Sequence, residues 1–290
     1  MRKRQLTGTL TLPVLAFVLA LTGCEEENTI FDGFASAAVA TSTETVALAY
    51  DTPLPLFVAC TTRDGAVTVT GTPGLQTISV TVTRAAWADT EDEANDRLQR
   101  IRYTAALDGA TLRLEFRSDE QDADVLDHAS VAFAVRIPSD AVLSLRTSNG
   151  AIRIAGVTGD VGADTSNGRI EAIRIAGDLA ADTSNGELRI EDVSGNVSAT
   201  TSNGAIAYSG RPGDGTQIAL RTSNGSITVR IPNDAAVALS AETSHGRIET
   251  DLDLVGDTAG DEWDAQLNPP AATTVRARTS NGSIRLLRLP

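Results

Sequence analysis

Hydrophobic and polar residues alternate along most of the chain beyond residue 45. Val67 and Val69 alternate with threonine, and Ile78, Val80 and Val82 alternate with serine and threonine. A period of two residues is typical of strands that are buried on one face only. The sequence therefore predicts an all-β protein built from many short strands.

One segment breaks this alternation and predicts a short helix over residues 91–101. Thr90 and Glu93 have the spacing of a capping box, and arginines gather toward the C-terminal end, where they complement the helix dipole. An acidic segment at 118–128 is expected to be a solvated loop, and a strand is expected at 131–137. We expect the helix to cover an open edge or end of the sheet structure.

From residue 143 onward the sequence repeats, and a Thr-Ser-Asn-Gly motif marks each repeat. The motif recurs at 147–150, 165–168, 183–186, 201–204, 222–225 and 279–282, with a Thr-Ser-His-Gly variant at 243–246. A second series of glycines lies midway between successive motifs, at Gly159, Gly177, Gly195 and Gly213. Each unit of about 18 residues therefore holds two short strands and two turns.

Apolar residues recur in the same frame. One column consists of Leu143, Val161, Leu179 and Val197, and a second of Ile152, Ile170, Leu188 and Ile206. Residues at a fixed spacing stack when each unit is one coil of a solenoid, although Asn-Gly is also a strong signal for an antiparallel meander of hairpins. A meander would leave its apolar face uncovered, whereas a solenoid turns its two faces onto each other. We therefore favour a parallel β-solenoid with coils of about 18 residues and two short strands per coil.

The repeated corner has an explanation that needs no ligand. Asn and Gly tolerate left-handed backbone conformations, so we expect this pair to turn the chain tightly while Thr and Ser bond backbone groups that the corner leaves unpaired. Stacking would align the corners in a ladder, in which a histidine once replaces asparagine. The predicted turn ladder consists of Asn149, Gly150, Asn167, Gly168, Asn185, Gly186, Asn203, Gly204, Asn224, Gly225, His245, Gly246, Asn281 and Gly282.

The start of the chain predicts export and membrane attachment. Three basic residues at 2–4 precede an apolar run at 10–21 that is too short to span a bilayer, which is typical of a signal peptide. The run Leu-Thr-Gly-Cys ending at Cys24 resembles the lipobox of bacterial lipoproteins. This resemblance implies cleavage before Cys24 and acyl chains on it that hold the protein at the membrane. Glu25, in place of the aspartate that marks inner-membrane retention, favours the outer membrane of a diderm cell.

These features predict one folded domain behind a processed leader. The predicted segments are a signal peptide at 1–23, the lipidated cysteine and a flexible tether at 24–43, and a β-solenoid domain at 44–290 with regular coils at 143–250, a long insertion at about 251–274 and the last coil at 275–290. The second cysteine, Cys60, lies in an apolar stretch and is expected to be a small buried residue.

Composition excludes several classes of protein. Apolar residues make up 41% of the chain, which is too many for a disordered chain, and the apolar set holds few aromatics. The formal charge is −14, and without the three cations of the leader it is −17. Nucleic acid and anionic lipid surfaces are therefore not expected as partners.

Several aspartates have spacings that could suit metal binding or catalysis. Asp160, Asp178 and Asp214 follow the second glycine series, as in calcium-binding β-rolls, but the paired glycines of the roll motif are missing. Stacked acids such as Asp164 and Asp182 would suit a carbohydrate-cleaving β-helix enzyme. However, the chain has only two histidines and no nucleophile elbow or zinc-protease motif. We predict no catalytic residue, no metal site and no cofactor.

The corner motif, the early unit at 64–69, the capped helix and the lipobox together resemble the DUF4097 family of β-strand-repeat bacterial envelope proteins, over about residues 44–290. The resemblance implies a non-catalytic module for binding, adhesion or scaffolding in the cell envelope, either periplasmic or at the surface. A protein or glycan ligand on the solenoid surface is implied, and no catalytic residues. The alternatives left open are an accessory role in envelope-stress sensing and a carbohydrate-active β-helix enzyme.

Overall fold

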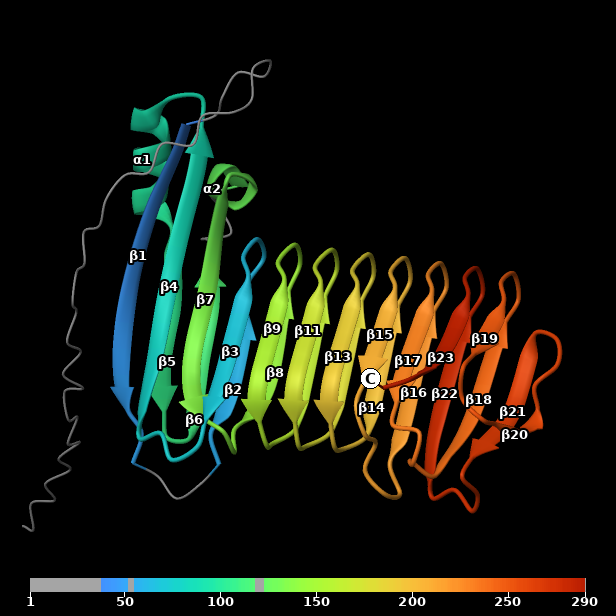
Figure 1. The fold of residues 1–290 in the computed structure, drawn as a ribbon. Helices are drawn as coiled ribbons and strands as arrows, with labels where there is room; N and C mark the ends of the chain where they lie inside the picture. The colour runs from blue at the N-terminus through green and yellow to red at the C-terminus, as the bar shows by residue number, and fades with distance from the viewer. Residues whose placement is uncertain (1–37, 52–54, 118–122, 290) are drawn as a thin grey trace, which may run out of the picture.

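The computed structural model describes residues 38–51, 55–117 and 123–289, almost all of them in strands and the turns between them (Figure 1). The N-terminal elements are β1 Ala38–Ala49, β2 Phe57–Thr61, β3 Val67–Thr72, β4 Thr77–Ala88, α1 Glu91–Arg100, β5 Arg102–Asp108, β6 Thr111–Arg117, α2 Ala123–Asp127 and β7 Ala129–Pro138. The regular coils contain β8 Val142–Thr147, β9 Ile152–Val157, β10 Val161–Thr165, β11 Ile170–Ile175, β12 Leu179–Thr183, β13 Leu188–Val193, β14 Val197–Thr201, β15 Ile206–Ser209, β16 Gln217–Thr222 and β17 Ile227–Ile231. The C-terminal strands are β18 Val237–Thr243, β19 Ile248–Thr250, β20 Val255–Asp257, β21 Glu262–Leu267, β22 Thr273–Thr279 and β23 Ile284–Arg288.

These strands build two sheets that face each other. Sheet A has eleven strands in the order β1-β4-β7-β3-β9-β11-β13-β15-β17-β23-β19. Sheet B has twelve strands in the order β20-β21-β18-β22-β16-β14-β12-β10-β8-β2-β6-β5. Among the described residues, no helix is long and apolar enough to cross a membrane. The predicted signal peptide, Cys24 and the first part of the tether lie outside the described residues.

Each regular coil contributes one strand to each sheet, in parallel with the coils on either side. In sheet B, Val161 lies in register with Leu143 and Leu179, and in sheet A, Ile170 lies in register with Ile152. The step between equivalent residues is 18 positions, as the columns predicted. The parallel β-solenoid is therefore confirmed, and an antiparallel meander is excluded for these coils.

The core lies between the two sheets and runs the length of the stack. Alternate residues of each regular strand are buried. Most are Ile, Leu, Val or Ala, and the last buried residue of each regular strand in sheet B is a threonine. Phe133 and Tyr208 are the largest fully buried side chains. Cys60 is also buried, as expected, and burial raises the pKa of its thiol to about 12. One coil buries too little apolar surface to fold alone, so stacking stabilises every coil.

The N-terminal part of sheet A is antiparallel and longer than the coils. β1 pairs with β4 from Ala38 opposite Ala88 to Ala49 opposite Thr77, and β4 pairs with β7. The flexible tether predicted at 24–43 was therefore wrong for its last six residues, since they already belong to β1. A local run of small residues and threonines resembles a linker, but here a partner strand satisfies its backbone groups.

Helix α1 covers the far end of β1 and β4, as Figure 1 shows. The predicted cap is present, since Thr90 Oγ1 accepts a hydrogen bond of 3.3 Å from the backbone N–H of Glu93. Ala94 is fully buried and packs with Ala40 and Ala88. The helix predicted from the capping box is therefore confirmed, and it covers one end of sheet A.

The acidic segment expected to be a solvated loop contains a second helix. Residues 123–127 form α2, and Val125 on it is 1% exposed within the main core. A helix of one turn and a half leaves almost no periodic signal in the sequence. Val125 is its one buried apolar residue, and the acidic residues around it made the segment resemble a solvated loop. The prediction of one helix was therefore incomplete.

The coil that comes last in the sequence is not the last in space. β22 lies between β16 and β18, and β23 lies between β17 and β19. The predicted insertion carries β20 and β21, and β21 pairs antiparallel with β18 at the end of sheet B. The outer coil, formed by β18 and β19, therefore precedes the coil of β22 and β23 in the sequence, although β22 and β23 lie beside β16 and β17 in space.

Candidate binding surface

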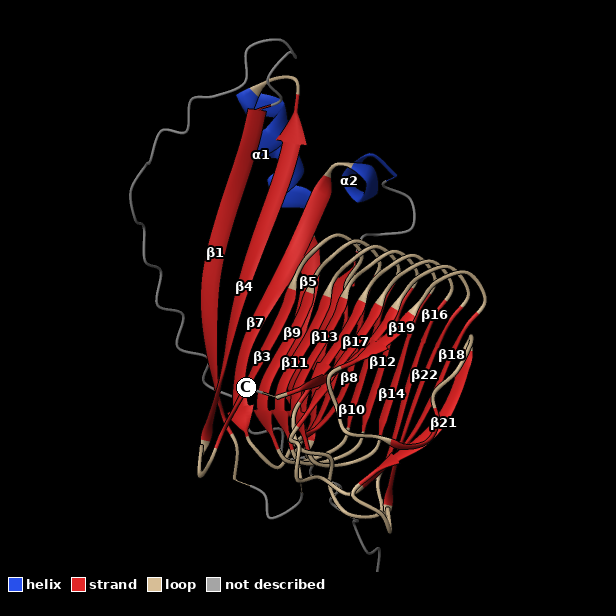
Figure 2. Cartoon of the chain, turned by 45° about the vertical axis from the view of Figure 1, so that its right-hand side comes forward, coloured by secondary structure: helices blue, strands red, loops and turns tan. Residues whose placement is uncertain are grey.

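The Thr-Ser-Asn-Gly corners form one row of loops along the upper edge of the stack in Figure 2. Each asparagine Nδ2 donates a hydrogen bond to the Oδ1 of the asparagine in the preceding coil. These bonds run from Asn167 to Asn149 (2.7 Å), Asn185 to Asn167 (2.7 Å), Asn203 to Asn185 (2.8 Å), Asn224 to Asn203 (2.8 Å) and Asn281 to Asn224 (2.9 Å). The row follows the order of the coils in space, so Asn281 comes directly after Asn224.

The two ends of this asparagine row carry different residues. At the N-terminal end Asp64 occupies the corner, and its Oδ1 accepts a hydrogen bond from Asn149 Nδ2. An acceptor-only carboxylate suits this end because every Nδ2 in the row points toward it. At the other end His245 follows Asn281, and its backbone N–H donates to the Ser280 carbonyl at 2.8 Å.

Threonine closes each corner from inside. The Oγ1 of Thr183 donates to the Gly168 carbonyl at 3.1 Å, and that of Thr201 donates to the Gly186 carbonyl at 3.1 Å. The corner threonines are buried, with Thr183 at 7% exposure. These bonds satisfy carbonyls that would otherwise be unpaired inside the stack.

The corner glycines do not adopt the left-handed conformation expected from the sequence. The described residues with positive φ are Gly74, Gly109, Gly156, Arg174, Asp192, Gly210, Gly215, Gly256, Gly260 and Asn268, and no corner glycine is among them. Instead, a Cβ built on Gly186 would overlap the carbonyl oxygen of Gly168 in the coil before it. Glycine is needed there because successive backbones approach too closely for any side chain.

The opposite corners hold the aspartates considered as calcium ligands. Asp160 Oδ1 accepts a 2.9 Å hydrogen bond from the backbone N–H of Asp178, and Asp178 Oδ1 accepts one of 2.8 Å from the backbone N–H of Asn196. Asn196 Oδ1 in turn accepts from Gln217, so Asp214 takes no part in this series. The part of the chain that the structure describes contains no group of three His, Cys, Asp or Glu side chains that could hold a metal ion.

The outer face of sheet B is hollowed along its regular coils, from β8 to β16. A shallow hollow of about 610 Å³ lies over small outward residues, with acids at one side. Asp164 and Asp182, the pair considered for catalysis, lie in register on this face. Asp164 forms a 3.7 Å ion pair with Arg146, and burial followed by the charge of Asp164 raises the pKa of Asp182. The Asp182 carboxylate also accepts a hydrogen bond from the Thr200 side chain, which acts in the opposite direction and lowers its pKa.

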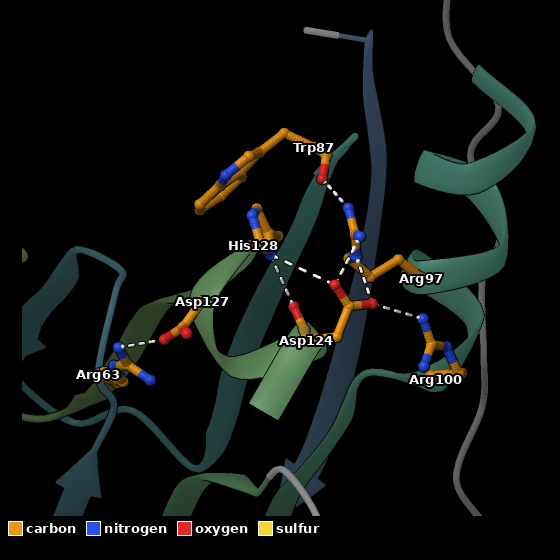
Figure 3. A network of polar contacts seen from close by, with 7 residues as sticks. All are labelled: Arg63, Trp87, Arg97, Arg100, Asp124, Asp127 and His128. Carbon is orange, nitrogen blue, oxygen red and sulfur yellow. Dashed lines mark hydrogen bonds and ion pairs between the residues drawn. The ribbon is translucent and has the colours of Figure 1, made fainter. Parts of the chain in front are cut away.

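A cluster of charged side chains connects the two helices at the N-terminal end (Figure 3). Asp124 on α2 accepts hydrogen bonds from Arg97 Nη2 (2.7 Å) and Arg100 Nη2 (3.0 Å) on α1. The hydrogen bond from Arg97 is the main cause that lowers the pKa of the Asp124 carboxyl. His128 Nδ1 lies 3.0 Å from the Asp124 carbonyl oxygen. The sequence placed both arginines toward the C-terminal end of the helix but gave no sign of the acid that they bind.

Known proteins similar to this chain include one described family and several solved structures. The model of the family described as Toastrack DUF4097 matches residues 76–287. No curated protein sequence matches the chain. Similar solved structures include a putative cell adhesion protein from Clostridium sporogenes (9% identity, TM-score 0.40, covering 86% of this chain and 100% of that chain) and a putative adhesin from Bacteroides fragilis (12% identity, TM-score 0.40, 87% and 98%).

A putative lipid binding protein from Parabacteroides distasonis is similar to the same extent, with 11% identity, a TM-score of 0.39 and coverage of 86% and 96%. The family match spans most of the chain and takes in the helix α1, the regular coils and the returning C-terminal coil. The chain therefore belongs to the Toastrack DUF4097 family.

Proposed function

We propose that this protein is a non-catalytic binding or scaffolding module of the bacterial cell envelope, held at the membrane by acyl chains on Cys24. The lipobox-like run before Cys24 supports the anchor, and the family and the stacked fold support the binding role. Glu25 supports an outer-membrane location. Export also agrees with a stack in which Cys60 is the one described cysteine and is buried, so that no disulfide is required.

The observation that carries the binding role is the exposed row of Ser and Asn side chains along the corners. Asn167, Asn185 and Asn203 each use one Nδ2–H and one Oδ1 lone pair for their neighbours, so each keeps a second N–H and a second lone pair for a ligand. The Nδ2 groups of Asn224 and Asn281 also reach serine carbonyls. The same set of groups repeats about every 4.8 Å, the spacing of neighbouring strands. A repetitive ligand rich in hydroxyl and amide groups can contact many equivalent positions at once and gain avidity from them. We therefore propose a glycan polymer of the envelope as the ligand.

The test compares two edges of the same stack. The corner variant carries Ser166→Arg, Ser184→Arg and Ser202→Arg, three exposed positions in successive corners. The control carries Thr158→Arg, Ala176→Arg and Ser194→Arg, three exposed positions with the same spacing on the opposite edge. Both place three like charges about 4.8 Å apart, so both carry a similar cost in stability.

Binding is measured by co-sedimentation of the purified chain with peptidoglycan sacculi from the producing bacterium. We expect the corner variant to lose at least tenfold in affinity while the control binds like the unchanged chain. Equal binding by both variants would remove the corner row as the ligand site. Binding to protein-containing outer-membrane vesicles but not to sacculi would replace the glycan with a protein ligand.

A further inference from the structure

The outer face of sheet B carries a row of side chains whose charges are arranged symmetrically. In spatial order, one residue per coil, the row is Arg146, Asp164, Asp182, Thr200, Arg221, Arg278 and Glu242. Over the three coils on either side of Thr200, each charge has its opposite at the equivalent place. Asp182 corresponds to Arg221, Asp164 to Arg278, and Arg146 to Glu242. The strands beyond, where Thr61 is in register with Arg146 and Glu262 with Glu242, lie outside this pattern.

The neighbouring row on the same face has matching shapes. It consists of Ser144, Gly162, Ala180, Ser198, Ala219, Arg276 and Ser240. Counted outward from Ser198, the one long side chain, Arg276, corresponds to the one glycine, Gly162. Gly162 also lines the hollow of about 610 Å³ on this face. The face therefore has a projection on one side of its centre and room for that projection at the equivalent place on the other side.

The charges nearest the centre lack partners of opposite sign. The outer ones pair within the chain, Arg146 with Asp164 at 3.7 Å and Arg278 with Glu242 at 3.0 Å. Within the described ranges, Arg221 has no ion-pair partner, and it lies in register beside Arg278. Asp182 lies in register beside Asp164. Like charges directly opposite each other on neighbouring strands are unfavourable, so each pair would be stabilised by an opposing charge from outside.

We propose that two copies of this chain associate through the outer faces of sheet B, about a two-fold axis that runs parallel to the strands through the coil of β14. Such an axis keeps the direction of the strands but reverses the order of the coils. It places Asp182 against the partner's Arg221 and Asp164 against the partner's Arg278. The same operation brings Arg276 over the partner's Gly162.

The size of the face predicts the strength of the association. Seven strands of about five residues cover roughly 29 by 17 Å, at about 4.8 Å per strand and 3.3 Å per residue. This is at the small end for a specific interface, and its contacts are mainly between charges. The dimer is accordingly weak and sensitive to salt, and its charge pattern fixes the orientation of the two copies.

The test uses the full chain in intact cells and a thiol cross-linker. Ser198→Cys places an exposed thiol beside the two-fold axis, and Ser209→Cys places a partly exposed thiol on the outer face of sheet A in the same coil. A short bis-maleimide should join two copies through position 198 and not through position 209. Equal cross-linking at both positions, or none at position 198, overturns the proposal.

Charge reversal then tests the symmetry. In the Ser198→Cys chain, Asp182→Lys alone or Arg221→Glu alone should reduce the cross-linked dimer at least tenfold, because each places like charges together twice across the axis. When the two variants are produced together with different tags, each restores the other's pairs, so the mixed dimer should return to at least half of the original yield. That recovery also shows that both variants fold. Unchanged cross-linking in the single variants, or no recovery in the mixture, overturns the two-fold arrangement.

Discussion

At the corner of each coil, the choice of residue is decided by how closely two backbones approach. Gly260 lies in a loop with φ at +72°, and a Cβ there would meet nothing within 4 Å. Glycine suits this position because the backbone is left-handed, not because space is short. Gly186 has no positive φ, but the carbonyl oxygen of Gly168 in the preceding coil occupies the space that a Cβ would take. The same amino acid therefore answers two different physical requirements in one chain.

Gly186→Ala should be strongly destabilising, by about 2 kcal/mol or more, because two rigid backbones must separate to admit the methyl group. Urea unfolding followed by circular dichroism measures the effect. Gly162→Ala is the control, since its Cβ would have as its nearest neighbour the Leu143 carbonyl oxygen at 3.7 Å. A small change is expected there, and similar midpoints for the two variants would contradict the close-approach explanation.

Tyr208 offers a second test at the scale of one residue. Its side chain is fully buried, and its hydroxyl has no hydrogen-bond partner in the described part of the chain. Burial, and then the charge of Asp192, raise the pKa of this phenol. Tyr208→Phe should leave stability unchanged or raise it by up to about 1 kcal/mol, because no bond is lost and a desolvated hydroxyl is removed. A destabilisation above about 1 kcal/mol in urea unfolding would show that the hydroxyl has a partner.

Among the elements, α1 and α2 are joined mainly by the charges around Asp124. The lowered pKa of this carboxyl means that its ionised form is favoured in the folded protein. Its contribution is therefore complete above the ordinary pKa of 3.8 and is lost as the pH falls through the lowered folded value. At neutral pH, Asp124→Asn should make the amides of α1 exchange hydrogen severalfold faster.

Hydrogen exchange with mass spectrometry measures this difference. Asp127→Asn is the matched control, because Asp127 lies on the same helix but pairs with Arg63 and not with α1. Exchange in α1 should be unchanged in that variant. If both variants leave α1 equally protected, apolar packing of Ala94 rather than the charge cluster holds the helix.

The elements that could be predicted from the sequence are those whose signal is repeated locally. Every regular coil carries its own corner motif and apolar columns, so the stacking of Val161 on Leu143 followed from spacing alone. The position of β22 between β16 and β18 could not be predicted, because all corners share one motif and any coil can stack on any other. The helix α2 and the start of β1 were missed because each depends on a distant partner rather than on its own pattern.

For the candidate surface, the sequence located the row of asparagines but gave the wrong reason for its glycines. The number of residues between motifs predicts which side chains align in neighbouring coils. It does not predict the φ angle of the glycine at the corner. The charge row on sheet B was also beyond the sequence. Its symmetry about Thr200 exists only because Arg278 and Glu242 exchange their order when β22 is inserted before β18.

For the whole molecule, the proposed anchor makes a simple prediction. Cys24→Ser should release the protein from membranes into the soluble fraction, because acyl chains rather than the short apolar leader hold it there. Fractionation of cells with detection by antibody measures this, and the unchanged chain is the control. A serine variant that stays with the membrane although its leader has been removed would contradict the lipid anchor.

The central claim is that the coils stack in parallel, about 4.8 Å apart, with the C-terminal coil inserted before the one that precedes it in sequence. Electron paramagnetic resonance between nitroxides on Ser148→Cys and either Ser280→Cys or Ser244→Cys tests it directly, in a chain with Cys24→Ser. Five coil steps separate Ser148 from Ser280 and six separate it from Ser244, so the account predicts distances of about 24 Å and about 29 Å. A meander would advance about 9.6 Å per repeat and give distances beyond roughly 45 Å, with Ser280 the farther of the two. Such distances would contradict the account.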